Sequence, residues 1–267
     1  MGSGVAVGAT CCSGRVKLTV LGKSPSWQDA GGACTSYLVT EGSTAVLVDF
    51  GSGALGKLRA RLDYRDVDAI VISHFHADHL LDLIPLACAL TYGPASQDGT
   101  TPPRLIAPRG SREFFAGLSA AIGDGDLLPN AFPLEEYEPS SRTEIGDIVV
   151  ATHPVPHIGP THAIELIAPA GGRVVFGADG PFSDELADAA RGADVLLAEA
   201  TLPDPEPGQC VHMSAAEAGR LARNAGVKRL VLTHISDELD LERSREIAAG
   251  EFGGEVEVAA EGAEYAV

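Results

Sequence analysis

Short apolar stretches of this sequence repeatedly end in a histidine or an acidic residue. Five residues follow such stretches: His74 after AIVIS, His153 after IVVAT, Asp179 after VVFGA, Glu199 after VLLA and His234 after RLVLT. Apolar runs of this length are typical of buried strands, and ligands of α/β folds bind beyond the carboxyl ends of strands. The pattern therefore predicts a fold in which several strand ends bring titratable side chains to one place.

The first of these strand ends carries the densest group, HFHADH at residues 74–79. On an extended chain His74 and His76 point to the same side, so both imidazoles can hold one cation. Asp78 and His79 follow where the chain turns, and they can point to a second position. Imidazole nitrogen and carboxylate oxygen suit Zn²⁺, with Mn²⁺ or iron as weaker alternatives. The segment therefore predicts a metal site.

Strands and helices alternate along the chain in the manner of sheets covered by helices. Residues 111–122 predict a helix capped by Ser111. A later helix begins with a capping box formed by Ser214 and Glu217. Residues 123–142, which are rich in glycine, proline and acidic residues, are expected to form a loop.

The charge of the chain restricts its partners. Because 37 acidic residues outnumber 19 basic ones, the formal net charge is −18, and the densest basic segment is only KLRAR at 57–61. Such a field repels polyanions, so a large nucleic acid is disfavoured as a partner. A small phosphodiester or nucleotide remains compatible, because bound cations can reverse the local field.

The composition also indicates where the protein works. Five cysteines without CxxC spacing predict free thiols in a reducing compartment, which favours a cytoplasmic location. No apolar stretch approaches 18 residues, so no membrane span is expected. Residues 1–15 are expected to be a flexible extension, and residues 16–267 to form one domain.

Together these features resemble the metallo-β-lactamase superfamily. HFHADH is similar to its H-x-H-x-D-H signature, and Asp49 in VDFGSG, His153, Asp179 and His234 follow in the expected order. The likeness covers residues 16–267. It implies a four-layer αββα sandwich with two metal ions in a cleft along one edge.

The resemblance also implies which residues hold the two divalent ions, zinc in preference to manganese or iron. The first ion would be held by His74, His76 and His153, the second by Asp78, His79 and His234, with Asp179 bridging both. HPVPHIGPTH offers two more histidines. His157 is the alternative to His153 as a ligand and otherwise a candidate for substrate binding, and His162 is expected either to contact substrate or to have no role. Asp49 is expected to be a structural carboxylate.

Within the superfamily the sequence is most similar to ribonuclease Z and its phosphodiesterase relatives. LAEAT at 197–201 resembles their H-E-A-T segment, and His212-Met-Ser214 resembles their His-Ser/Thr element. Two departures stand out. Ala178-Asp179-Gly180 replaces the usual Gly-Asp-Thr, and the segment between His162 and Asp179 is too short for the tRNA-gripping arm of many ribonuclease Z enzymes.

The resemblance implies a phosphodiesterase for small nucleotides, cyclic ones included, in which a hydroxide bridging the metals attacks phosphorus. Asp78, His212 and Glu199 are the expected catalytic residues, with Glu199 orienting His212 as a proton donor. Alternatives on the same scaffold are a lactonase, a thioesterase, a β-lactamase or a tRNA 3′-processing endonuclease. A redox di-iron protein and a non-catalytic metal protein are disfavoured. Relatives are often dimers, so the likeness also suggests a homodimer.

Overall fold

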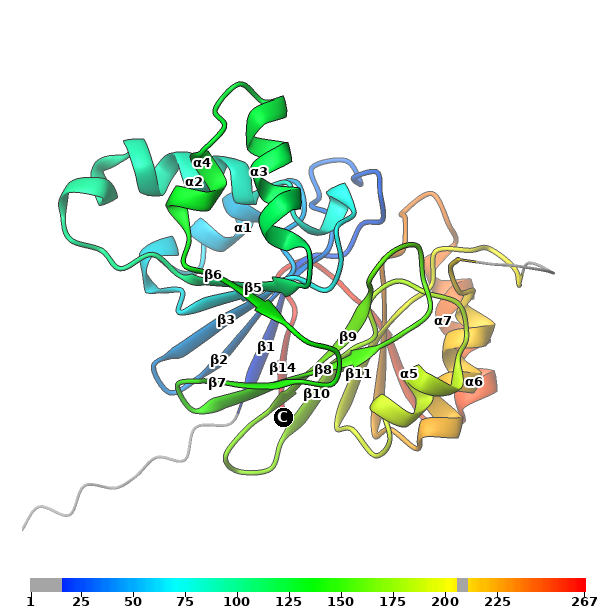
Figure 1. The fold of residues 1–267 in the computed structure, drawn as a ribbon. Helices are drawn as coiled ribbons and strands as arrows, with labels where there is room; N and C mark the ends of the chain where they lie inside the picture. The colour runs from blue at the N-terminus through cyan, green and yellow to red at the C-terminus, as the bar shows by residue number, and fades with distance from the viewer. Residues whose placement is uncertain (1–15, 206–210) are drawn as a thin grey trace, which may run out of the picture.

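The computed structural model describes residues 16–205 and 211–267, in which two seven-stranded sheets face each other (Figure 1). The expected extension at 1–15 lies outside the described residues, as do Cys11, Cys12 and Cys210. The N-terminal sheet has the order β14-β1-β2-β3-β4-β5-β6, and the C-terminal sheet the order β13-β12-β11-β10-β9-β8-β7. Each sheet is therefore built mainly from one half of the chain.

Both sheets are antiparallel on one side and parallel on the other. In the N-terminal sheet the strands are β1 Lys17–Gly22, β2 Ser36–Glu41, β3 Thr44–Val48, β4 Ala69–Val71, β5 Arg104–Pro108, β6 Leu134–Tyr137 and β14 Glu264–Ala266. In the C-terminal sheet they are β7 Arg142–Ile145, β8 Ile148–Pro154, β9 His162–Ile167, β10 Arg173–Phe176, β11 Val195–Glu199, β12 Arg229–Thr233 and β13 Glu255–Val258. The parallel runs are β3 to β6 and β10 to β13.

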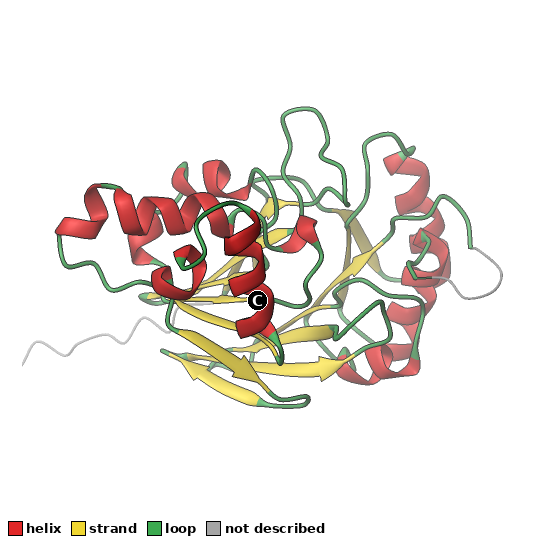
Figure 2. Ribbon diagram, turned by 45° about the horizontal axis from the view of Figure 1, so that its top comes forward, coloured by secondary structure: helices red, strands yellow, loops and turns green. Residues whose placement is uncertain are grey.

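Helices cover the outer face of each sheet, which gives four layers (Figure 2). The helices on the N-terminal sheet are α1 Ala54–Arg59, α2 Leu83–Tyr92, α3 Ser111–Ala121 and α4 Leu127–Ala131. Those on the C-terminal sheet are α5 Asp184–Ala189, α6 Ala215–Ala225 and α7 Leu241–Phe252. Short 3₁₀ turns occur at Tyr64–Asp66, Ala77–His79 and Pro94–Gln97. The predicted αββα sandwich is confirmed.

The two helix caps predicted from the sequence have different outcomes. The capping box is confirmed, because Ser214 Oγ accepts from Glu217 N at 3.4 Å and Glu217 Oε2 accepts from Ser214 N at 2.9 Å. The prediction that Ser111 caps its helix is wrong: Gly110 is the cap residue, with φ of 92°, and Ser111 Oγ donates to Glu136 instead.

The expectation of a loop at 123–142 is also wrong. This segment contains α4 and β6, because Leu127, Leu128 and Ala131 are buried in the apolar layer beneath α2 and α3. Two leucines and an alanine supply that contact despite the surrounding glycines and acids.

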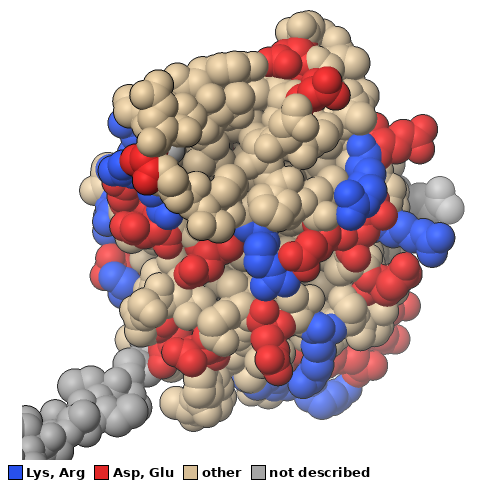
Figure 3. Space-filling view, turned by 60° about the vertical axis from the view of Figure 1, so that its left-hand side comes forward, with Lys and Arg blue, Asp and Glu red and all other residues tan. Residues whose placement is uncertain are grey.

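The surface of the protein mixes the two signs of charge. On the face shown in Figure 3, acidic and basic side chains are interspersed, and no continuous basic area is visible. Within the described part of the chain, no helix combines the length and the hydropathy that crossing a bilayer requires.

The layer between the sheets is apolar apart from a few polar links. Tyr37 on β2, which is fully buried, pairs its hydroxyl with Thr233 Oγ1 on β12 at a distance of 2.5 Å. Its ring also contacts Phe176 at the end of β10, with 5.1 Å between ring centroids. One side chain therefore joins the N-terminal sheet to two strands of the C-terminal sheet, directly below their ends.

Tyr37→Phe should lower the free energy of unfolding by about 1–2 kcal/mol, because it removes a buried hydrogen bond and leaves Thr233 without this partner. Urea denaturation measures the loss. Tyr92→Phe is the matched control, since Tyr92 is 66% exposed and its hydroxyl bonds Asp124 at the surface. Equal effects of the two changes would contradict a special role for the link between the sheets.

Candidate metal centre

Four strands from the parallel parts of the two sheets end at the same edge of the sandwich. Asp49 follows β3, His74 follows β4, Asp179 follows β10 and His234 follows β12. The first two come from the N-terminal sheet and the last two from the C-terminal sheet. The site therefore lies between the two halves of the chain.

The backbone is strained at these strand ends. Asp49, Ala178 and His234 have φ values of 55°, 56° and 46°, in the left-handed region. Residues other than glycine adopt this region at a cost of about 1–2 kcal/mol each. Such strain persists only where the surrounding structure holds it in place, and it is concentrated at functional sites.

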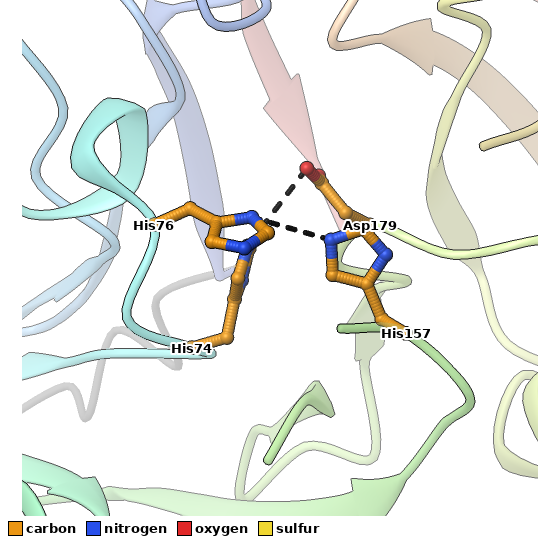
Figure 4. A group of neighbouring side chains, drawn as sticks. All are labelled: His74, His76, His157 and Asp179. Atoms are coloured by element: carbon orange, nitrogen blue, oxygen red, sulfur yellow. Dashed lines mark hydrogen bonds and ion pairs between the residues drawn. The ribbon is translucent and has the colours of Figure 1, made fainter. Parts of the chain in front are cut away.

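A first group of ligand atoms comes from His74, His76, His157 and Asp179, whose side chains point toward one another (Figure 4). These atoms all lie within 4.8 Å of one another. His76 Nδ1 is 3.3 Å from His157 Nε2. His157 Nδ1 donates to the Val211 carbonyl at 3.0 Å, so the proton is on Nδ1 and Nε2 keeps the lone pair that a metal needs.

A second group comes from Asp78, His79, Asp179 and His234, all of them buried. His234 Nε2 lies 3.0 Å from Asp78 Oδ2 and 3.2 Å from Asp179 Oδ2. His79 Nε2 lies 3.4 Å and 3.3 Å from the same two oxygens. In an ideal tetrahedral zinc site with the usual Zn–N and Zn–O lengths, the ligand atoms are about 3.3–3.4 Å from one another. The distances in this group are similar, so the spacing suits one ion.

The centre contains buried polar atoms that the protein itself does not satisfy. Among the described residues, His74 Nε2, His79 Nε2 and Asp179 Oδ1 are buried without a hydrogen-bond partner. An unpaired buried polar atom costs about 1–3 kcal/mol, so three at one place call for another partner. Nitrogen and carboxylate donors of this kind fit divalent cations, with Asp179 shared between the two groups.

Electrostatics keep Asp179 ionised and the rings of His74 and His157 neutral. Burial raises the pKa of Asp179, but the charges of His234 and His79 outweigh burial and leave this pKa well below its usual range. Burial lowers the pKa of His74 far below its usual value and that of His157 to about 4, so both imidazoles are neutral at pH 7. Metal ions need deprotonated ligands, and these three groups meet that condition. Burial also lowers the pKa of His79, but the charges of Asp179 and Asp49 outweigh burial and raise this pKa well above its usual value, so His79 would release a proton on binding a metal.

Hydrogen bonds behind the ligands fix their orientation. Asp49 Oδ2 accepts from His79 Nδ1 at 2.6 Å, and Ser73 donates to both oxygens of Asp49, from N and from Oγ, at 2.7 Å. Asp49 is thus fully engaged behind His79, in keeping with a structural carboxylate. On the other side, Thr201 Oγ1 lies 2.7 Å from His234 Nδ1. Sequence reasoning missed Ser73 and Thr201, although each lies beside a motif that it used.

Glu199 and His212 form a separate pair next to the ligands. Glu199 is fully buried and accepts from His212 Nδ1 at 2.9 Å. It also accepts from Thr201 Oγ1 and from the backbone nitrogens of Gly180 and Met213, at 2.7, 2.7 and 3.1 Å. With four donors on its two oxygens, Glu199 is held in place and orients His212.

The charge of Glu199 also changes the titration of its partner. Burial lowers the pKa of His212, but the hydrogen bond and the negative charge of Glu199 outweigh burial, so the pKa is raised overall. The His212 ring centroid lies 5.4 Å from that of His157 and 5.5 Å from that of His234. It therefore stands next to one member of each ligand group.

The structure corrects the choice of His153 as a ligand. β8 extends to Pro154, so His153 is still paired in the sheet, opposite Ala163. Directly opposed residues share a face, and here it is the face that α5 and α6 cover. There His153 Nε2 bonds Glu165 Oε2 at 2.9 Å, and its side chain is 32% exposed. His157, which follows the true end of the strand, stands in its place.

His162 is not placed where a substrate could reach it. It is only 5% exposed and packs edge-on against Tyr137, with 5.0 Å between ring centroids. Its position as the first residue of β9 turns it into the layer between the sheets, and it belongs to neither ligand group. Of the two expectations for His162, its burial favours the one without a role in substrate contact.

The unusual Gly180 after Asp179 has a steric cause. A Cβ at this position would lie 2.6 Å from the carbonyl oxygen of Pro156, the residue before His157. The usual threonine would push this loop away. Gly51 makes a comparable close approach to the carbonyl of Asp78, which brings the VDFGSG turn against the HFHADH turn.

Comparisons with known proteins agree with this geometry. The sequence model described as "Beta-lactamase superfamily domain" matches residues 44–235. Protein Rv1339 of Mycobacterium tuberculosis is 32% identical over 244 residues, covering 90% of this chain and 88% of its own. The probable metallo-hydrolase YhfI of Bacillus subtilis is 29% identical, covering 92% and 98%. A ribonuclease Z of Thermoplasma volcanium is 26% identical, covering 84% and 88%.

Solved structures share the fold. The crystal structure of YhfI from Bacillus subtilis superposes with a TM-score of 0.84 at 27% identity, over 94% of this chain and 99% of that one. The human tRNase Z, short form, superposes with a TM-score of 0.72 at 20% identity, over 94% and 99%. The second likeness concerns the fold alone.

His157→Ala should reduce the divalent metal that the purified protein retains, because it removes a donor from the first group. His153→Ala is the matched control, since its ring bonds Glu165 away from the ligands. Elemental analysis after dialysis gives the metal content of each variant. A loss of metal in His153→Ala, with none in His157→Ala, would reverse the assignment.

Proposed function

The chain belongs to the beta-lactamase superfamily, and from this premise we propose that it is a two-metal phosphodiesterase acting on small nucleotides, cyclic ones included. The observation that carries the proposal is the place of His212, held by Glu199 and next to both ligand groups. Phosphodiester hydrolysis needs charge neutralisation at phosphorus and a proton for the leaving oxygen, and these groups supply both.

The proposed roles follow from the contacts. His74, His76 and His157 would hold one divalent cation, Asp78, His79 and His234 the other, and Asp179 both. Two cations held in this way would supply an activated water and neutralise charge on the phosphoryl oxygens. Glu199 accepts from Nδ1 of His212 and so fixes the ring and its charge. His212, whose side chain is 22% exposed, then gives a proton to the leaving oxygen.

Features outside the centre favour a small substrate. The net charge is −18, so a polyanion meets long-range repulsion. The segment from His162 to Asp179 is occupied by β9, a short turn and β10, which leaves no arm to grip tRNA. The relatives include proteins named ribonuclease Z and metallo-hydrolase, and both names are compatible with phosphoester chemistry.

A substrate panel tests the proposal. We expect turnover of bis-p-nitrophenyl phosphate and of 2′,3′- or 3′,5′-cyclic nucleotides with Zn²⁺ or Mn²⁺, and loss of turnover with a chelator. The panel includes a tRNA precursor, a lactone, a thioester and a β-lactam as competitors. Preference for one of these over every diester would replace the proposed function by that activity.

His212→Ala should lower kcat by about 10²–10⁴-fold on a cyclic nucleotide, because the sugar oxygen leaves poorly without a proton. The loss should be smaller on bis-p-nitrophenyl phosphate, since p-nitrophenolate leaves unprotonated. Metal content should not change. Steady-state kinetics on both substrates give the ratio, and an equal loss on the two would show that His212 does not protonate the leaving group.

A further inference from the structure

A half-exposed tryptophan is hydrogen-bonded to the turn that carries His234, and the proposed mechanism gives it no role. Trp27 is 49% exposed and lies in the segment between β1 and β2. Its indole nitrogen donates to Ser236 Oγ at 3.2 Å. Ser236 is two residues after His234, and two residues span at most about 7 Å. The indole is therefore anchored to the turn that carries His234, one member of the second ligand group.

We propose that Trp27 is the residue that selects a nucleotide substrate, by stacking on its base while the phosphodiester lies at the metal centre. This inference rests on the proposed function for the position of the phosphate. The indole N–H is already used by Ser236, so the exposed remainder of the side chain is a flat apolar surface. Stacking of a base on such a surface is worth about 1–3 kcal/mol.

The segment that carries Trp27 is held firmly against the turn after β12. Lys23 forms an ion pair with Asp29, and its Nζ also donates to the carbonyl of Ile235 at 2.9 Å. Asp29 Oδ1 in turn accepts from Asp237 N at 3.0 Å. Because Lys23 is buried, with 8% exposure, these contacts are shielded from water. The backbone on both sides of Trp27 is thus held in place before any ligand arrives, and the indole keeps its bond to Ser236, which lowers the entropic cost of stacking.

Other exposed apolar residues lie next to the same centre. Ile158 is 61% exposed and follows His157, and Val211 is 37% exposed and precedes His212. Together with Trp27 they account for three of the five large hydrophobic residues that are exposed in the described part of the chain. Large apolar side chains at the margin of a charged centre suit a ligand with an anionic part and an aromatic part.

The negative net charge of the protein explains why apolar contacts to the base would be needed for substrate binding. At a net charge of −18, the long-range field of the protein repels the phosphate of a substrate, and bound cations would have to offset this repulsion locally. Stacking does not depend on the sign of the charge. It can therefore provide binding energy from a part of the substrate that does not react, which is how remote groups promote catalysis.

The fluorescence of the protein tests the inference directly, because Trp27 is the only tryptophan in the chain. With the metal-supplemented protein excited where adenine does not absorb, 5′-AMP should quench the emission saturably. Ribose 5-phosphate, which has the phosphate but no base, should leave it unchanged. Binding of 5′-AMP by calorimetry without quenching would overturn the inference, and so would equal quenching by both compounds.

Kinetics of variants separate this inference from the proposed function. Trp27→Ala should lower kcat/KM for a cyclic nucleotide about 5- to 100-fold, with Trp27→Phe close to the wild type. A ribose cyclic phosphate without a base should be hydrolysed equally by all three proteins. Tyr92→Ala is the control, an exposed aromatic at the far end of α2 that should change neither rate.

The outcomes are distinct. If the diesters are hydrolysed but Trp27→Ala affects both substrates equally or neither, the phosphodiesterase stands and the role of Trp27 falls. If no diester is hydrolysed but 5′-AMP still quenches Trp27, the base-binding role stands and the proposed activity falls. If there is neither hydrolysis nor quenching, both are overturned.

Discussion

The central constraint on this structure is a cluster of buried polar atoms that have no hydrogen-bond partner within the protein. Asp179 is 1% exposed, yet its Oδ1 has no hydrogen-bond partner, and two imidazole nitrogens beside it share that condition. A carboxylate buried in this way is tolerated only with compensating positive charge. The family to which the chain belongs and the spacing of the donors agree that divalent cations supply this charge.

The other features of the centre follow from holding these donors in place. Three residues with strained backbone stand at the strand ends, and Asp49 and Thr201 bond the outer nitrogens of His79 and His234. The two sheets each contribute ligands, so the spacing of the donors depends on the apolar layer between the sheets. The geometry of the centre therefore depends on packing in that layer. A shift of one sheet would move the ligands of one half of the chain relative to those of the other half.

The sequence alone predicted the sandwich and most of the residues that form the candidate metal centre. HFHADH and the residues after β10 and β12 were found because a strand end and a ligand residue coincide there. His153 was misassigned because the length of β8 is set by its pairing with β9, which extends to Pro154. The pattern IVVAT-His cannot show that the ladder continues for two more residues. The helix at 127–131 was missed for a related reason, since its burial depends on helices distant in sequence.

The last strand of the chain, β14, lies in the same sheet as the first strand, β1. β14 pairs antiparallel with β1, Lys17 opposite Ala266 and Thr19 opposite Glu264, although all intervening strands from β7 to β13 lie in the other sheet. The edge of β1 therefore stays open during translation until residues 264–266 have left the ribosome. Completion of the first sheet is therefore a late event in the folding of the nascent chain.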